Sequence, residues 1–480
     1  MCCATSTSHA ASGRRDRVTR GLRRPGVRDP AVLERQAEWR AWYFYDWANS
    51  AYVTTVGTVL FSPYLISVAE RSSCGRVGTD EDPCKTDLTV VGLHVSPGSL
   101  VFYVVTAATI ISAVVLPVVG AMADRTPRKK LLMASFAWTG GAFASGMFLV
   151  TGTDWQLGAV LLLLANICLG SSLVIYDSIL CDIASPDERD EVSSRGWALG
   201  YLGGGLLLAV NLVVVLLHGT FGLDKALAVR LCLLSAGVWW AGFTLIPYRG
   251  IRDRPPVNTL REPGGLVRQS FGQLWATLRG MRAYPVTLLF LVAYLFFNDG
   301  IQTVITAAST YGEKQLGFST SVLIATILLV QFVAFGGALL FGRIAARWGG
   351  YCTILWGLVV WMVIVVTAFV LPAHRLLPFL GLAVSIGVVL GGTQALSRSF
   401  YSQLIPRGRE AEYFSLYQAC ERGTSWLGTL VFGLVHQLSG SYRPAIVALV
   451  AFFGVGIALM SRVDARRGIE QAGNAVPAVV

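Results

Sequence analysis

The 480-residue chain carries little charge: Asp, Glu, Lys and Arg make up 14% of it, against about 25% in a soluble domain. Its five histidines form no cluster with cysteine at metal-ligand spacing, which excludes the common zinc motifs. A GxxxxGK[ST] loop for ATP and an HExxH helix are also missing from the sequence. We therefore expect no metal, no cofactor and no enzymatic activity.

Long apolar runs dominate what is present. Hydrophobic residues make up 54% of the chain, and twelve stretches are each long enough to cross a bilayer, which takes about 20 residues. They lie near 42–69, 97–122, 130–150, 156–180, 196–217, 227–247, 284–309, 318–342, 351–371, 376–397, 411–436 and 444–461. The sequence therefore predicts an all-α membrane protein with twelve transmembrane helices, surrounded by the lipid bilayer.

The net charge of +11 is unevenly distributed. With the N-terminus inside, the inner segments hold 30 of the 39 lysines and arginines, the outer loops hold 8, and Arg422 lies within a span. Because positive charge stays on the cytoplasmic side, we expect both termini in the cytoplasm. The basic charge thus indicates topology and some contact with anionic lipid, and we expect no nucleic-acid partner.

Two segments outside the spans carry structural predictions. Residues 1–41 are polar, with nine arginines and no apolar core, so they are not a secretory signal and are predicted to form a disordered basic tail. Cys74 and Cys84 share the long first outer loop, 70–96, on the oxidising side of the membrane. A disulfide between them is predicted, with two free thiols as the alternative.

The chain divides into two halves. A long inner segment, 248–282, is rich in arginine and proline and separates the six spans of 42–247 from the six of 284–461. Residues 462–480 follow as a second cytoplasmic tail. We expect each six-span half to form its own helical bundle.

An internal duplication supports this division. After the second span the sequence reads GAMADRTPRK (120–129), and 222 residues later, after the eighth span, it reads GRIAARWG (342–349). The inner loops after the fourth and tenth spans recur at an offset of 220. Two six-helix halves related in this way are the architecture of major facilitator transporters.

The first of those loops resembles the signature of that superfamily. Asp124 can face the positive N-terminal end of a neighbouring helix, which we expect to be the eleventh span. Arg125 can pair with Asp177 or Asp182 at the inner end of the fourth span, so that the loop latches the two halves on the cytoplasmic side. The alternative is that the basic cluster only anchors topology. Asp46, near the inner edge of the first span, is interpreted as a gate or loop-docking residue.

Four further blocks narrow the resemblance. They read YDWANSAY (45–52), SRGWALGYLGG (194–204), NDGIQT (298–303) and GGTQALSRS (391–399). In this order the chain resembles the family of vacuole effluxers, the autophagy-related permeases and their bacterial relatives, although Cys181 stands where the family would have proline. The resemblance implies a membrane transporter with the major facilitator fold. Its yeast-type members export amino acids; for this chain it implies a bacterial cell membrane but no particular substrate.

Ionisable residues at membrane depth are candidates for function because they are costly to keep there. Asp299 lies about 25 Å along the seventh span and Arg422 about 16 Å into the eleventh, at 1.5 Å per residue. They form either a buried structural pair or a split site in which Arg422 binds a carboxylate and Asp299 an ammonium. Glu421 is turned about 100° away from Arg422 and is a candidate proton carrier.

Smaller polar residues occur at similar depth in the spans that line the cavity of this superfamily. They are Asn49 and Tyr52 in the first span and Asn298 and Gln302 in the seventh. Each is a candidate ligand contact, although such residues more often bond one helix to another.

The function predicted from these observations is transport of a small solute, such as an amino acid, by alternating access. Protons are a candidate coupling ion, and we expect a monomer. The alternative is a receptor or sensor with a transporter fold that binds a small ligand without moving it.

Overall fold

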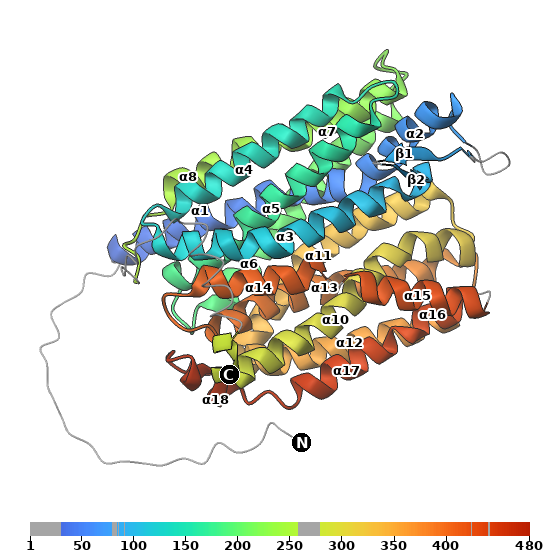
Figure 1. Ribbon diagram of the computed structural model, residues 1–480. Coiled ribbons are helices and arrows are strands. Elements are labelled where there is room, and N and C mark those ends of the chain that lie inside the picture. The colour runs from blue at the N-terminus through green and yellow to red at the C-terminus, as the bar shows by residue number, and fades with distance from the viewer. Residues whose placement is uncertain are drawn as a thin grey trace, which may run out of the picture.

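The computed structural model describes residues 30–78, 84, 86–90, 92–257, 279–423, 425–439 and 442–480, most of them helical (Figure 1). Inside a bilayer every backbone N–H and C=O must bond within its own segment, so long apolar runs become helices. Residues 1–29 and 258–278, which hold most of the predicted tail and linker, lie outside the described residues.

The first half contributes six spans. They are α1 (Pro30–Tyr52), continued through the π-helical segment η1 (Val53–Leu60) into α2 (Phe61–Cys74); α3 (Leu100–Arg125), preceded by η2 (Pro97–Ser99); α4 (Lys129–Gly146) with η3 (Met147–Leu149); α5 (Trp155–Ile183); α6 (Arg189–Leu216); and α7 (Lys225–Phe243), followed by α8 (Leu245–Gly250).

The second half repeats the pattern after a short turn, η4 (Met281–Ala283). Its helices are α10 (Pro285–Thr310) with η5 (Tyr311–Gln315), α11 (Thr320–Trp348), α12 (Gly350–Val370), α13 (Leu376–Gln403), α14 (Glu410–Gly423), α15 (Ser425–Ser439), α16 (Tyr442–Ala448) and α17 (Val450–Met460), and the terminal α18 (Ala465–Gln471).

The helices agree with the predicted spans, with one refinement. Among the described residues, eleven helical stretches are long and apolar enough to cross a membrane. The remaining predicted span, 411–436, corresponds to α14 and α15, which are described on either side of residue 424. Together they make the twelve-helix arrangement of the major facilitator fold.

The prediction of a disordered N-terminal tail is wrong for residues 30–41, because α1 begins at Pro30. Two acidic residues hold this extension against the segment that follows α8. Glu34 accepts a hydrogen bond from Arg252 (2.9 Å), and Glu38 accepts one from Arg254 (2.8 Å). These ion pairs explain why a polar segment continues the helix beyond the apolar span.

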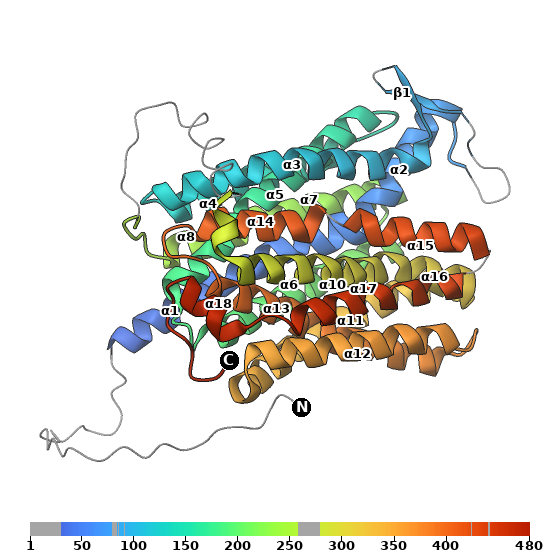
Figure 2. The same cartoon turned by 60° about the horizontal axis from the view of Figure 1, so that its bottom comes forward.

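Each half has its own hydrophobic core. Trp42 and Trp240 are fully buried in the first core, which is built almost wholly from residues before 252. Trp361 and Tyr417 are buried in the second, which begins at Met281. Figure 2 shows the helices of both halves running roughly side by side along the long direction of the molecule.

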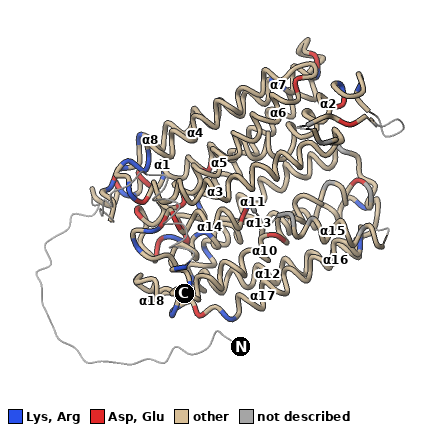
Figure 3. The backbone as a smooth tube through the Cα atoms, in the orientation of Figure 1, with Lys and Arg blue, Asp and Glu red and all other residues tan. Residues whose placement is uncertain are grey.

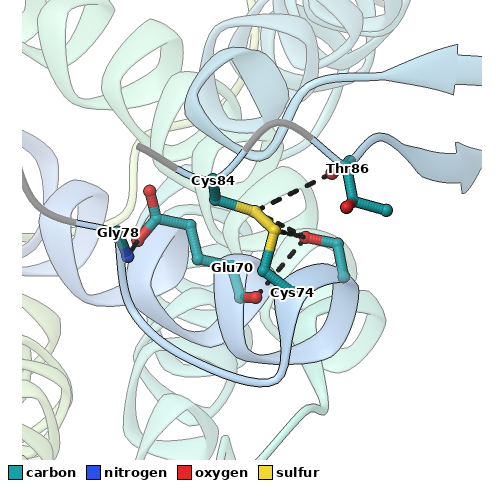
Figure 4. The surroundings of a disulfide bond; sticks show 6 residues. Glu70, Cys74, Gly78, Cys84 and Thr86 are labelled. Atoms are coloured by element: carbon teal, nitrogen blue, oxygen red, sulfur yellow. Dashed lines mark hydrogen bonds between the residues drawn. A yellow bond between two sulfur atoms is a disulfide. The ribbon is translucent and has the colours of Figure 1, made fainter. Parts of the chain in front are cut away.

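The first outer loop is braced at both of its described ends. A two-stranded antiparallel hairpin pairs β1 (Leu88–Val90) with β2 (Leu93–Val95). The predicted disulfide joins Cys74, the last residue of α2, to Cys84 (Figure 4). Beside it the Glu70 carboxylate accepts a hydrogen bond from the backbone N–H of Gly78 (3.0 Å).

Charge separates the two ends of the molecule. In Figure 3 lysine and arginine gather at the end where α1 begins and where α8 and α18 lie, and few appear at the opposite end. We call the end that is rich in lysine and arginine the basic end, and the opposite end the disulfide end. The long apolar bodies of the helices lie between them, as expected for a chain that spans a bilayer.

Candidate functional site

A buried arginine joins the two halves on the basic side of the centre. Arg398 lies near the end of α13, and its side chain is 3% exposed. Its Nη2 is 3.0 Å from Asp46 Oδ2 in α1, and its Nη1 is 3.3 Å from Asp177 Oδ1 in α5. We call Arg398 and its acceptors Asp46, Asp177 and Ser193 the Arg398 lock.

All five N–H groups of this guanidinium have acceptors, and every acceptor belongs to the first half. Nε donates to Ser193 Oγ (3.0 Å), and Nη2 donates to the Ser193 carbonyl (3.2 Å) as well as to Asp46. Nη1 is shared between Asp46 Oδ1 (3.4 Å) and Asp177. Because a buried arginine without partners would be very costly, this complete set of bonds favours the closed arrangement of the halves.

Aromatic rings surround the lock. The guanidinium carbon of Arg398 lies 4.8 Å from the ring centre of Trp42 and 5.4 Å from those of Tyr176 and Trp197. Such contacts attract a cation to the ring face and exclude water from it. A glycine makes the approach possible, because a Cβ at Gly196 would lie 2.7 Å from Asp46 Oδ2 and 3.2 Å from Arg398 Nη2.

A second set of polar residues continues from the lock into α14. The Gln418 amide nitrogen donates to Asp177 Oδ2 (2.9 Å) and to Glu421 Oε2 (3.1 Å). The Gln418 amide oxygen accepts from Arg422 Nε (3.2 Å). One glutamine side chain therefore contacts the lock and both Glu421 and Arg422 of α14.

This geometry corrects the prediction that Glu421 and Arg422 point away from each other. Gln418 precedes them by three and four residues, and positions i+3 and i+4 both lie beside position i on a helix surface. The two long side chains reach back along α14 and meet at one amide.

Asp299 and Arg422 are not paired: the described residues contain no ion pair between them. Asp299 Oδ2 instead accepts from the backbone N–H of Gly428 (2.7 Å) in α15. The interpretation as a buried structural pair is therefore wrong for this conformation. Asp299 Oδ1 and the nearby Thr303 hydroxyl are buried, and neither has a hydrogen-bond partner among the described residues.

The other predicted ligand contacts mostly join helices. Asn298 donates to the Glu421 carbonyl (3.2 Å) and accepts from Gln394 of α13 (3.0 Å). Tyr52 donates to Asn166 of α5 (3.3 Å).

Asn49 and Gln302 are the two remaining residues that were predicted to contact the ligand. The Asn49 amide bonds to the Tyr45 carbonyl of its own helix (2.7 Å), so it bridges no helices through that group. Gln302 is half-buried, one turn beyond Asn298 on α10.

The predicted contact of Asp124 with the eleventh span is present. Its two carboxylate oxygens accept from the backbone N–H groups of Ala411 and Glu412, each at 2.9 Å, at the start of α14. Close approach depends on Gly120, where a Cβ would lie 2.5 Å from the Ala411 carbonyl oxygen. An aspartate of the first half thus caps a helix of the second.

Asp177 and Asp182, the predicted partners of Arg125, both bond to other groups. Asp177 bonds to Arg398 and Gln418, and Asp182 lies 3.1 Å from Lys129 Nζ. The reason is that α13 continues to Gln403 and brings Arg398 to Asp177.

Further bonds close the basic end between the halves. Arg189 of α6 donates to the Ser402 carbonyl (2.8 Å), and Ser193 donates to the Ala395 carbonyl (2.7 Å). Ser399 also donates to Asp190. With the lock and Asp124, these contacts join α3, α5 and α6 to α13 and α14, so this conformation is closed at the basic end.

Sequence reasoning missed Arg398 and Gln418. Arg398 was counted with the inner loop because the apolar run ends at 397, whereas the helix continues for six more residues. A usable signal existed: Asp46 and Asp177 are two acids at the inner membrane edge, and the GGTQALSRS block supplies the arginine that can neutralise them. Gln418 carries no charge and left no comparable signal.

The fold and the contacts between two six-helix halves define a major facilitator transporter, a membrane protein that moves a small solute. Residues 34–473 match the family described as vacuole effluxer Atg22 like, and the chain belongs to that family. This confirms the resemblance inferred from the sequence blocks.

Relatives extend over almost the whole chain. The MFS-type transporter YxiO of Bacillus subtilis (strain 168) is 28% identical over 441 residues, covering 91% of this chain and 97% of that protein. Autophagy-related protein 22-1 of Phaeosphaeria nodorum is 25% identical over 515 residues, covering 92% and 87%.

Solved structures share the fold at low identity. A bacterial homologue of the iron transporter ferroportin in its outward-facing state has a TM-score of 0.63 at 14% identity, covering 90% of this chain and 99% of that chain. The major facilitator transporter FucP in the outward conformation has a TM-score of 0.62 at 11% identity, covering 89% and 98%. These relatives are transporters, which agrees with the expectation that the chain is not an enzyme.

Proposed function

We propose that the protein transports an amino acid by alternating access, and that Gln418 links the substrate site to the Arg398 lock. The observation that carries the proposal is the position of one amide between Asp177 on one side and Glu421 and Arg422 on the other. When a substrate changes the bonds of Glu421 and Arg422, the bond between Gln418 and Asp177 must therefore change as well.

The substrate class follows from Glu421 and Arg422 of α14. Arg422 donates a hydrogen bond from Nε to the amide oxygen of Gln418. Its two terminal nitrogens have no bond to another described residue, so they can hold a carboxylate in a bidentate contact. Glu421, half-buried beside it, can accept an ammonium group. A carboxylate and an ammonium close together are the two ends of an amino acid. This arrangement replaces Asp299 with Glu421 as the acidic side of the site.

Asp299 is proposed as the proton-coupling group. Protonation would remove its charge and turn Oδ1, which has no partner in the described part of the chain, into a hydroxyl donor, which suits a fully buried carboxyl. Among the described residues no cation lies within ion-pair distance of it, so a proton is the simplest source of neutralisation.

The proposed cycle uses competition at Gln418. A substrate ammonium competes for Glu421, and a substrate carboxylate draws Arg422 away, so Gln418 is released from both and its 2.9 Å bond to Asp177 weakens. The lock is then less stable, and the basic end can open. A substrate shifts this balance only if it binds the two states with different affinity, which this competition provides.

The proposal also specifies how the protein is oriented in the membrane and which membrane holds it. The basic end faces the cytoplasm, which puts both termini there, and the relative in Bacillus subtilis supports a bacterial cell membrane. A monomer suffices, because every group of the lock belongs to one chain.

The test is flux of labelled amino acids into proteoliposomes with and without a pH gradient. Arg422→Gln and Glu421→Gln should abolish binding, whereas Gln418→Leu should bind substrate and transport it much more slowly. Gln437→Leu, an exposed glutamine of α15, is the matched control and should transport normally. Binding without flux in the unaltered protein would favour the receptor alternative, and absence of amino-acid binding would reject the substrate class.

A further inference from the structure

An apolar groove runs along the outer surface of the first half, apart from the lock. It has a volume of about 550 Å³ and lies against α6, α7 and α8. Its wall includes Leu207, Val238, Trp239 and Phe243, and Val238 is 58% exposed. Gly242 also lines the groove, and a Cβ there would meet no atom within 4 Å. The groove is wide and apolar enough to accept an acyl chain.

The groove ends at two arginines on the basic end. Arg249 of α8 lines it, and Arg249 and Arg40 of α1 together line a neighbouring hollow of about 460 Å³. The two helices are held together there, since a Cβ at Gly250 would lie 2.3 Å from the Cβ of Ala41. Both arginines therefore lie beside the same hollow, and Figure 3 shows lysine and arginine gathered at the end of the molecule where α1 and α8 lie.

The nearby acids are already used by other cations. Glu34 pairs with Arg252, Glu38 pairs with Arg254, and Asp253 lies 3.5 Å from Lys130. In the part of the chain that the structure describes, neither Arg40 nor Arg249 forms an ion pair, and both are exposed. Two uncompensated positive charges beside an apolar groove complement an anionic group attached to a hydrocarbon chain.

We propose that this surface is a binding site for one anionic phospholipid of the leaflet at the basic end. The phosphate lies between Arg40 and Arg249, and one acyl chain lies in the groove past Phe243 to Gly242. A phosphate held by two guanidinium groups receives several charge-assisted hydrogen bonds. The site is separate from the proposed substrate groups, so its failure and that of the transport proposal can be distinguished.

The test titrates delipidated full-length protein with phosphatidylglycerol and counts bound lipid by native mass spectrometry. Phosphatidylethanolamine with the same acyl chains is the control lipid. Each arginine near the membrane surface contributes roughly fivefold to affinity for an anionic lipid, so Arg40→Gln with Arg249→Gln should weaken phosphatidylglycerol binding about 25-fold. The matched control replaces Arg343 and Arg347, two exposed arginines of α11, by glutamine and should leave the affinity nearly unchanged.

A third variant tests the groove itself. Gly242→Leu places a side chain where there is room for it, so the fold should tolerate it, and lipid binding should fall although both arginines remain. The proposal is overturned if both lipids bind equally, if the two arginine pairs have equal effects, or if Gly242→Leu leaves binding unchanged. The last result would mean that the arginines attract phosphate alone.

Discussion

At the scale of single residues, Arg398 is the group on which closure of the basic end depends most. It brings a charge from the second half into a pocket formed wholly by the first, and five donors find acceptors there. Opening the basic end must break all of these bonds. A solute transporter therefore needs a compensating change nearby, which in the proposed cycle is the release of Gln418.

Removing this arginine should destabilise the protein. Arg398→Gln leaves Asp46 and Asp177 buried without a cation, and stranding a buried charge costs roughly 3–5 kcal/mol in soluble proteins. We expect a lower unfolding temperature in detergent and, as a control, almost no change for the exposed Arg343→Gln. Replacing both aspartates by asparagine in the same chain should recover most of the stability. No recovery would mean that the two carboxylates are not the reason for the loss.

Asp299 and Arg422 should behave as independent residues. Because they do not touch, Asp299→Asn and Arg422→Gln should change stability additively, with an interaction energy below about 0.5 kcal/mol in a double-mutant cycle. Unfolding of the two single variants and the double variant measures this term. Substantial rescue in the double variant would restore the interpretation as a structural pair.

At the scale of secondary structure, α14 connects the contacts that control the basic end. Its first N–H groups are capped by Asp124 of α3, and Gln418, Glu421 and Arg422 follow two to three turns later. Movement of this one helix would affect the cap, the lock and the proposed substrate groups together. This explains why Gln418, Glu421 and Arg422 are kept in an apolar fold.

Weakening the cap should change the rate of transport more than substrate binding. Asp124→Ala removes acceptors from two N–H groups at the start of α14, and loss of such a cap costs about 1 kcal/mol, or roughly fivefold in the balance of states. Asp124→Asn keeps one oxygen acceptor and should have a smaller effect. Transport rate and equilibrium affinity, measured on the same preparation, separate the two effects. Reduced affinity at an unchanged maximal rate would contradict this prediction.

At the scale of the whole molecule, the two halves must separate at the basic end for a solute to pass. The structure offers a direct way to prevent this, because Cys181 of α5 lies 3.9 Å from the Ser402 carbonyl of α13. The proposal that 42–247 and 284–461 move as units can therefore be tested with a native cysteine.

Cross-linking across this contact should stop transport reversibly. Ser402→Cys, in a chain from which the remaining free cysteines have been removed, should form a disulfide with Cys181 on oxidation, and flux should fall to background. Reductant should restore the flux, and Cys181→Ala in the same chain should abolish the effect of oxidation. Normal flux after complete cross-linking would reject movement of the halves at this point.

Hydropathy and charge were enough to predict the twelve spans, and the sequence blocks were enough to predict the family. Both follow from local rules: a bilayer requires long apolar helices, and motif blocks keep their order along the chain. The contact of Asp124 with the eleventh span was also predictable, because a carboxylate at a membrane edge favours a helix N-terminus. The Cys74–Cys84 disulfide followed from two cysteines in one outer loop.

The lock and the substrate groups depended on tertiary structure. A hydropathy window ends at a charged residue, so it placed Arg398 in a loop, whereas partners on α1, α5 and α6 allow α13 to continue and bury it. Depth along a helix placed Asp299 and Arg422 in the membrane, but depth does not determine which neighbouring helix each side chain faces. Asp299 accepts from Gly428 of α15, and Arg422 donates to Gln418, because neighbouring helices decide which buried donors and acceptors meet.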